Sequence, residues 1–137
     1  MAIILDADVI IRGEKGSFDL KRWLEGRSHE KFEVAAITVA ELWHGVERAT
    51  GPHKQRKLQY LQAFLASISV APYTEQTAYE HARIWAQLEA AGKMAGYYDL
   101  IVAATALERA SQVATFNTRH FDSVPGLMVI EPKVNSS

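Results

Sequence analysis

The sequence lacks cysteine altogether, and no charge of one sign dominates it. The absence of cysteine excludes disulfide bonds, zinc–thiolate sites and thiol nucleophiles. The 15 lysines and arginines nearly balance the 16 aspartates and glutamates, which gives a formal net charge of -1. This balance neither supports nor excludes nucleic acid binding, because tight sequence-independent binding usually needs a strongly basic domain. A polyanionic partner must therefore be held by a local basic rim or through a bound cation.

Long hydrophobic runs and targeting segments are also missing. The longest apolar stretches, such as Leu100 to Leu107, fall far short of the roughly 20 residues that span a bilayer. The N-terminus has no basic segment and reaches Asp6 too early for a signal peptide. We therefore expect a cytoplasmic protein that has no membrane segment.

The length of 137 residues indicates one domain. A chain of this size, 48% apolar, buries enough surface to fold without a metal ion or a disulfide. We place the single domain at residues 1–132 and expect the polar segment 133–137 to be a frayed tail.

Apolar runs alternate with helical periodicities along the chain, which favours an α/β fold with a parallel sheet. In the helix after Thr74, the spacing predicts that Ala78, Ala82, Trp85 and Leu88 face inward. We expect most of the three tryptophans, Trp23, Trp43 and Trp85, to lie in the core. The predicted strands are 2–5, 32–37, 68–72, 112–116 and 127–130. The predicted helices begin at Ser17, Thr38, Lys54, Thr74 and Tyr98.

Polar residues stand where the predicted strands end. Asp6 follows the first strand, Glu41 lies three residues into the helix after the second strand, and Asn117 follows the fourth strand. Asp99 lies in the first turn of the apolar helix that begins at Tyr98. Because ligands bind outside the carboxyl ends of parallel strands, these groups are the candidate functional residues.

Each of these residues also has a purely structural interpretation. Asp6 and Asn117 are common turn formers, and Asp99 would gain from the dipole of its helix. Glu41 completes a Thr38-to-Glu41 capping box. Taken together they point to chemistry, because carboxylates about 4 Å apart repel by ~4 kcal/mol per pair at an effective dielectric constant near 20. Such a cluster needs a cation or a protonated carboxyl group, and oxygen ligands alone suit Mg²⁺ or Mn²⁺ and phosphoryl hydrolysis.

Four segments, in order along the chain, resemble the motifs of PIN-domain nucleases. The resemblance covers nearly the whole chain and is strongest to VapC-type toxins of toxin–antitoxin pairs. It implies a three-layer α/β/α sandwich with a central parallel sheet and a Mg²⁺- or Mn²⁺-dependent endoribonuclease. It also implies a homodimer that is inhibited by a cognate VapB-type antitoxin. The segments are Leu5 to Ile10, Ala36 to Leu42, Tyr98 to Ala104, and Thr115 to Phe121 followed by Val124 to Leu127.

The resemblance also assigns roles to residues. Asp6 and Asp99 would be the direct metal ligands, and Glu41 would complete the acidic catalytic pocket. Asn117 stands where many relatives carry a fourth acidic residue, so it keeps an oxygen donor but loses a charge, which favours one metal ion over two. Asp8 stands where many relatives have Asn, Ser or Thr, and it would replace that charge if the strand continued past Asp6.

Basic and aromatic residues adjoin the acidic segments. Arg119 and His120 are the predicted substrate-binding residues, and with Arg12, Lys15 and Lys93 they would form a basic rim for RNA. The alternative is that they are solvated loop charges. The pair Tyr97 and Tyr98 would either stack on an unpaired base or pack in the core or a dimer interface. We expect His44, one turn after Glu41, to be a helix-surface histidine.

Two other functions compete with the nuclease. A haloacid-dehalogenase-like phosphatase is suggested by Asp6-Ala7-Asp8, but Val9-Ile10 follows where that family usually has Gly-Thr. A non-catalytic PIN-like binding module with a weakened metal site is suggested by Asn117.

Overall fold

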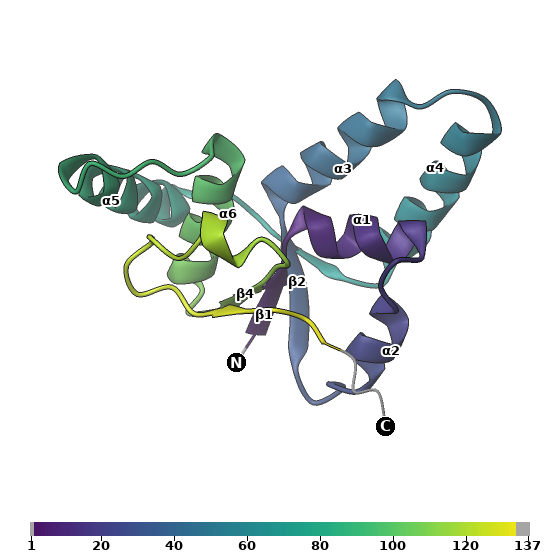
Figure 1. Ribbon diagram of the computed structural model, residues 1–137, viewed down its shortest axis with the longest axis horizontal. Coiled ribbons are helices and arrows are strands. Elements are labelled where there is room, and N and C mark those ends of the chain that lie inside the picture. Colours follow the sequence, from purple (N-terminus) through teal and green to yellow (C-terminus); the bar gives the residue numbers. More distant parts are fainter. Residues whose placement is uncertain (1, 134–137) are drawn as a thin grey trace.

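The computed structural model describes residues 2–133, and it confirms the predicted α/β fold with a central parallel sheet (Figure 1). The sheet has five strands in the order β3-β2-β1-β4-β5, and every neighbouring pair is parallel. Position 1 and most of the predicted tail, residues 134–137, lie outside the described residues. The strands are β1 (Ala2–Leu5), β2 (Lys31–Ala35), β3 (Ser69–Ala71), β4 (Gln112–Ala114) and β5 (Val129–Ile130).

The central strand β1 is buried on both faces, as its continuous apolar run predicts. Ile3 pairs with Phe32 of β2 on one side and with Gln112 of β4 on the other. Ile3, Ile4 and Leu5 are fully buried, and alternate residues point to opposite faces of the sheet. Ile3 and Leu5 accordingly belong to one hydrophobic core and Ile4 to a second.

Helices cover both faces and complete the three layers (Figure 1). The first core packs β1 against α1 (Ala7–Lys15), α2 (Leu20–Glu25), α3 (Ala36–Arg48) and α4 (Gly51–Ala66). The second core packs the other face against α5 (Glu75–Ala90) and α6 (Tyr97–Glu108). A short 3₁₀ helix, η1 (Thr118–His120), follows β4. Among residues 2–133, no helix has the length and apolar character that crossing a membrane requires.

Several predicted boundaries were wrong at the residue level. Strand β2 ends at Ala35 and α3 begins at Ala36, so Ile37 is helical and Thr38 does not open the helix. Asp19, not Ser17, caps α2, because its carboxylate accepts a hydrogen bond from the Arg22 N–H at 3.1 Å.

The inward face of α5 also differs from the prediction. Leu88 is buried against α6 as predicted, but Ala82 is exposed, Trp85 is 51% exposed, and Ile84 is buried in their place. Trp23 is buried as expected, and Trp43 is partly buried against the first core. Helical spacing alone did not decide which side of α5 the neighbouring helix covers.

The strand order places a ligand-binding edge at β1. Chain connections run outward from β1 in both directions, first through β2 and β3 and later through β4 and β5. Such a reversal opens a crevice at the carboxyl ends of the two strands on either side of it. In this molecule those strands are β1 and β4.

Candidate functional site

Asp6 stands directly after β1 and is only 6% exposed. One carboxylate oxygen accepts a hydrogen bond from the Ala7 N–H at 2.9 Å, which caps α1. The other accepts a hydrogen bond from the Thr115 hydroxyl, also at 2.9 Å. Asp6 therefore caps a helix that the sequence analysis did not predict, and these contacts fix its carboxylate at the edge of the sheet.

Thr115 connects the end of β4 to the acidic residues, and the sequence analysis assigned it no role. Its fully buried hydroxyl donates to Asp6, lies 3.3 Å from an Asp8 oxygen, and accepts from the Asn117 N–H at 3.0 Å. The sequence does contain a sign of this role, because Thr115 is the first polar residue after the buried strand residues Val113 and Ala114. The prediction that the strand continued to Phe116 concealed it.

Asp8 reaches the same place through a helix and not through an extended strand. It lies in the first turn of α1 and accepts a hydrogen bond from the Phe116 N–H at 3.0 Å. Burial raises the pKa of Asp8, and these hydrogen bonds oppose that rise. A second carboxylate thus lies next to Asp6, although the strand stops at Leu5.

Glu41 is free of the capping role that its sequence context suggested. It is the sixth residue of α3, and the helix begins too early for Thr38 to cap it. Burial raises the pKa of Glu41 to about 7, and the negative charges of Asp6 and then Asp99 add to the rise. Glu41 is therefore a half-buried carboxyl group that faces two other acidic residues.

Asp99 comes from the first turn of α6. Gly96, the N-cap of α6, makes room for it, since a Cβ atom at Gly96 would lie 2.8 Å from an Asp99 oxygen. That oxygen is 3.2 Å from Nδ1 of His120 in η1. Burial raises the pKa of Asp99, while the neighbouring His120 lowers it.

These carboxyl groups share one electrostatic environment, as the parallel sheet predicted. Burial, the charge of Asp8 and, more weakly, that of Asp99 raise the pKa of Asp6 to about 6, against the lowering effect of the Thr115 hydrogen bond. Asp6, Glu41 and Asp99 come from three distant segments of the chain. Asp99 makes Asp6 harder to ionise, and Asp6 and Asp99 make Glu41 harder to ionise. A positive charge at this point would relieve that repulsion.

The donor set fits a hard divalent cation, because it consists of carboxylate oxygens without sulfur. With the side chains as they stand, however, no group of three His, Asp or Glu residues within 2–133 is arranged to hold a metal ion. Asp6 is engaged by Ala7 and Thr115, and Asp99 by His120. The electrostatics therefore favour a cation, and the side-chain contacts show which interactions it would have to replace.

The other predicted site residues lie at the edge of this cluster. His120 contacts Asp99, whereas Asn117 and Arg119 are exposed, and no side-chain contact of Asn117 is found within the described part of the chain. The guanidinium carbon of Arg12 lies 4.1 Å from the centre of the Phe116 ring, so Arg12 packs on an aromatic side chain. The roles assigned to Asn117, Arg119 and His120 stay predictions.

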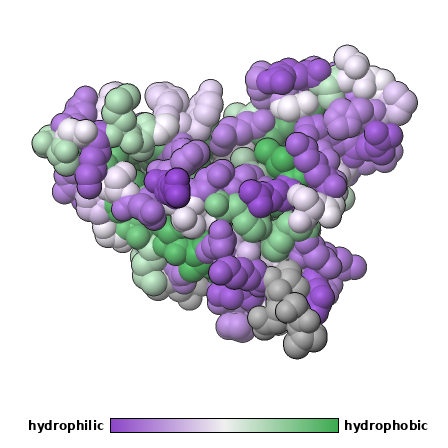
Figure 2. Space-filling view, in the orientation of Figure 1, coloured by the Kyte–Doolittle hydropathy of each residue, from purple (hydrophilic) through white to green (hydrophobic). Residues whose placement is uncertain are grey.

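A cavity of about 350 Å³ opens next to Glu41, between α1, α3 and α6. Tyr98 and His44 line it together with Glu41. His44 is exposed as expected, but it also belongs to the wall of this cavity. The space-filling view shows the surface hollowed between the lobe of α5 and α6 and the lobe of α3 and α4 (Figure 2). Glu41, at the edge of the acidic cluster, is therefore accessible from this cavity.

Comparisons with known proteins agree on one family. The model of the PIN domain family matches residues 3–127. Ribonuclease VapC1 of Rickettsia felis is 28% identical over 132 residues, which are 95% of this chain and 96% of the relative. The tRNA(fMet)-specific endonuclease VapC of Salmonella typhimurium is 32% identical over 96 residues, 70% of this chain and 71% of the relative. The crystal structure of DNA-bound VapBC from Salmonella typhimurium superposes with a TM-score of 0.87 at 26% identity, covering 96% of this chain and 98% of that one.

Proposed function

The chain belongs to the PIN domain family and to its VapC ribonucleases, and from this premise we propose that it is a Mg²⁺- or Mn²⁺-dependent endoribonuclease toxin. It hydrolyses phosphodiester bonds of RNA, and a cognate VapB-type antitoxin neutralises it. The family match replaces the phosphatase alternative that Asp6-Ala7-Asp8 suggested.

One observation of this structure supports the metal site most strongly. At the carboxyl end of β1, the charge of Asp99 raises the pKa of Asp6, and the charges of Asp6 and Asp99 raise the pKa of Glu41, although the three residues come from separate segments. Asp6 and Asp99 would hold the cation, and Glu41 would complete the pocket. When bound, the cation supplies positive charge against the phosphate and makes a water molecule more acidic.

The remaining chemistry comes from the side chains. Glu41 orients the attacking water and accepts its proton, a role for which a carboxylate beside that water is suited. Thr115 holds Asp6 in place through its hydroxyl. His120 is exposed and contacts Asp99, and from this position it would bind the phosphate. In-line attack would leave a 5′-phosphate and a 3′-hydroxyl.

Initiator tRNA is the first RNA to test, because the relatives from Salmonella typhimurium and Shigella flexneri are named tRNA(fMet)-specific endonucleases. We further propose that the protein forms a homodimer and acts in the cytoplasm. The exposed residues Asn117 and Arg119 would contact the substrate from η1.

The test is cleavage of end-labelled initiator tRNA by the purified protein with Mg²⁺, with Mn²⁺ and with EDTA. We expect cleavage with either metal ion and none with EDTA. Asp6→Asn and Asp99→Asn, made separately, should each abolish it. Full metal-dependent cleavage by either variant would show that the assignment of the metal ligands is wrong.

Calorimetry with Mn²⁺ separates the nuclease from the non-catalytic binding module. The nuclease should bind Mn²⁺ weakly but measurably, and Asp99→Asn should remove that heat. A binding module with a weakened site would give no heat in either form and would leave the tRNA intact.

A further inference from the structure

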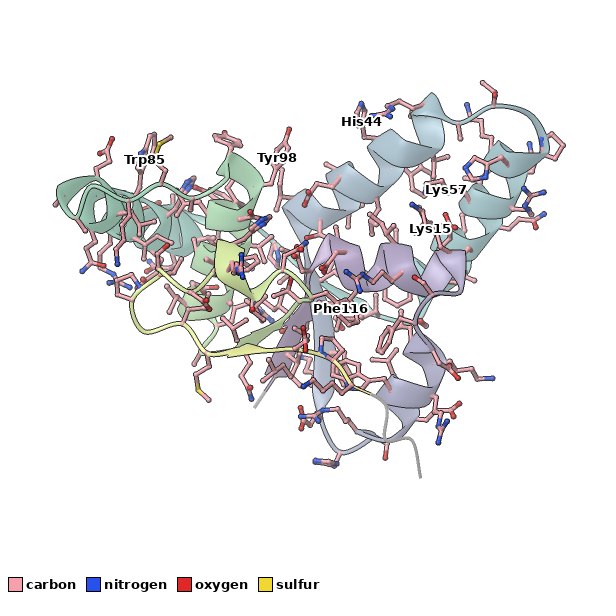
Figure 3. All side chains as sticks on the ribbon, in the orientation of Figure 1. Lys15, His44, Lys57, Trp85, Tyr98 and Phe116 are labelled. Atoms are coloured by element: carbon pink, nitrogen blue, oxygen red, sulfur yellow. The ribbon has the colours of Figure 1, made fainter. Side chains whose placement is uncertain are left out.

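A second cavity continues from the acidic site along the hairpin of α3 and α4. It has a volume of about 550 Å³, and its lining includes Glu41 and His44, which also line the 350 Å³ cavity beside Tyr98. The two cavities therefore share Glu41 and His44 of α3 and form one trough with the Glu41 carboxylate near its middle. Figure 3 shows Tyr98 on the side of α6 that faces α3, and Lys15 and Lys57 between α1 and α4.

The far end of this trough is lined by basic side chains, which we call the basic wall: Lys15, Arg48, His53 and Lys57. Lys57 is paired with Glu14 at 2.9 Å, with both side chains largely buried. Lys15 and Arg48 are exposed and make no ion pair within residues 2–133. Unpaired cations in a concave wall attract a polyanion, and this chain has no overall positive charge to do so.

The basic wall also offsets the electrostatic repulsion between the acidic cluster and the phosphates of RNA. Phosphates are repelled by Asp6, Asp8, Glu41 and Asp99 as they approach. Cations along the same trough hold phosphates a short distance from the carboxylates and so offset that repulsion. The sequence analysis included Lys15 in a basic rim, but it did not find Arg48, His53 or Lys57, because they are brought in by the turn between α3 and α4.

The other end of the trough carries an aromatic ring. Tyr98 is 49% exposed, and its only ring contact within the described residues is the edge of Tyr97, with the ring centres 5.5 Å apart. A nucleic acid base can stack on such a ring only after it has left its own stack, so this end favours an unpaired nucleotide.

We propose that the trough is the path of an unpaired RNA segment, with a base stacked on Tyr98 at one end and phosphates bound by Lys15 and Arg48 at the other. The scissile phosphate then lies between them, beside Glu41. This inference rests on the proposed ribonuclease function and deepens it, because it specifies the residues that bind the RNA on either side of the cleaved bond.

The charge arm of the test measures binding of a fluorescein-labelled 12-nucleotide RNA of mixed sequence by anisotropy at several salt concentrations. All proteins carry Asp99→Asn so that the RNA is not cut. Lys15→Ala with Arg48→Ala should weaken binding and reduce the slope of log K against log salt by about 1.4, since each phosphate contact to a single strand contributes about 0.7. Lys21→Ala with Lys31→Ala removes the same charge from exposed positions in α2 and at the start of β2, and should leave the slope unchanged.

The stacking arm uses Tyr98→Ala and Tyr98→Phe in the same Asp99→Asn background. Tyr98→Ala should weaken binding of the single strand about 5- to 100-fold, and Tyr98→Phe should bind like the parent protein. Tyr79→Ala, which removes a 60% exposed tyrosine on α5, is the matched control. The same sequence held in a perfect hairpin stem should bind more weakly than the single strand.

The outcomes separate this inference from the proposed function. If wild-type protein cleaves RNA but the Lys15/Arg48 variant keeps its affinity and salt slope, the trough is not the RNA path. If that variant binds RNA normally but no longer retains a co-expressed antitoxin, the basic wall is a protein-binding surface and the inference is overturned. If wild-type protein cleaves no RNA yet loses RNA binding with these substitutions, the RNA path stands and the ribonuclease function fails.

Discussion

Asp6 shows how one side chain serves both the fold and the site. Its carboxylate caps α1 and accepts the Thr115 hydroxyl, which are interactions that stabilise the charged form. Burial and the charge of Asp8 nevertheless raise its pKa to about 6. The site therefore keeps its carboxylates in place through backbone and hydroxyl donors while it leaves their mutual repulsion uncompensated. Such perturbed groups are typical of functional sites.

The repulsion between the carboxylates makes the stability of the metal-free protein depend on pH through Glu41. Its pKa in the folded protein, about 7, lies above the ordinary value of 4.5, so the folded state binds the proton more tightly than the unfolded chain. The stability from this group is complete below pH 4.5 and is lost as the pH rises through about 7. We expect Glu41→Gln to raise the melting temperature in EDTA by a few degrees at pH 8 and to have little effect at pH 4.

Glu47→Gln, on an exposed position of the same helix, is the control for that experiment and should change the melting temperature equally little at both pH values. An increase in melting temperature for Glu41→Gln that was larger at pH 4 than at pH 8 would contradict the prediction. It would mean that ionised Glu41 stabilises the fold.

Thr115 is predicted to be a positioning residue for Asp6. Thr115→Val keeps the shape but removes the donor at 2.9 Å, which should cost about 1.5–3 kcal/mol of stability because the acceptor is charged. The affinity for Mn²⁺ or the cleavage rate should fall about 10- to 100-fold. Thr115→Ser keeps the hydroxyl and should keep the Mn²⁺ affinity and the cleavage rate of the wild-type protein. Calorimetry measures the affinity, and a cleavage assay measures the rate. A loss of stability without any loss of Mn²⁺ affinity or cleavage would show that Thr115 serves the fold alone.

At the scale of elements, periodicity was sufficient for the type and order of the strands and of α2 to α6. It missed α1, which had not been predicted, and it did not fix the ends of most elements. The apolar run of β1 and the apolar helix α6 were predicted well because each is buried on all sides. The start of α3 was missed because Ile37 is equally suited to a strand and to a helix. Asp6, Glu41 and Asp99 could be found from strand order alone, whereas Thr115 and the basic wall depend on where β4 ends and how the α3–α4 hairpin folds back.

The shifted start of α3 gives a prediction about Thr38. The predicted capping role would make Thr38→Val destabilising by about 0.5–2 kcal/mol. In the structure its hydroxyl is buried and has no hydrogen-bond partner within the described residues, so removing it should leave the protein as stable or make it more stable. Urea denaturation measures the difference. If Thr38→Val lowered the free energy of unfolding by about 1 kcal/mol, the typical value for a helix cap, the capping interpretation would be correct after all.

Thr74→Val provides the matched comparison, since Thr74 caps α5 in a true capping box. Its hydroxyl accepts from the Thr77 N–H at 3.4 Å, and its own N–H donates to the Thr77 hydroxyl at 3.0 Å. The same chemical change should here lower the free energy of unfolding by about 1 kcal/mol.

At the scale of the whole molecule, α3 separates two different surfaces. Ile37 and Ala40 line the cavity beside Glu41 and also a cavity of about 490 Å³ on the other side, where Tyr73, His81 and Tyr97 complete the lining. Trp85 extends this second surface, because its ring stacks on His81 at 5.7 Å (Figure 3). The first surface is charged and suits RNA, whereas the second is aromatic and suits a protein partner.

The aromatic surface is where we expect the second subunit of the homodimer to bind. Trp85 and Tyr73 are 51% and 45% exposed, and tryptophan and tyrosine are the side chains that most often dominate interface energies. Light scattering after gel filtration should give twice the monomer mass for the wild-type protein and the monomer mass for Trp85→Glu. Met128→Glu, at a 54% exposed apolar position before β5, should remain dimeric. A Trp85→Glu protein that stayed dimeric would place the subunit interface elsewhere, because a buried, unpaired carboxylate in the centre of an interface is not tolerated.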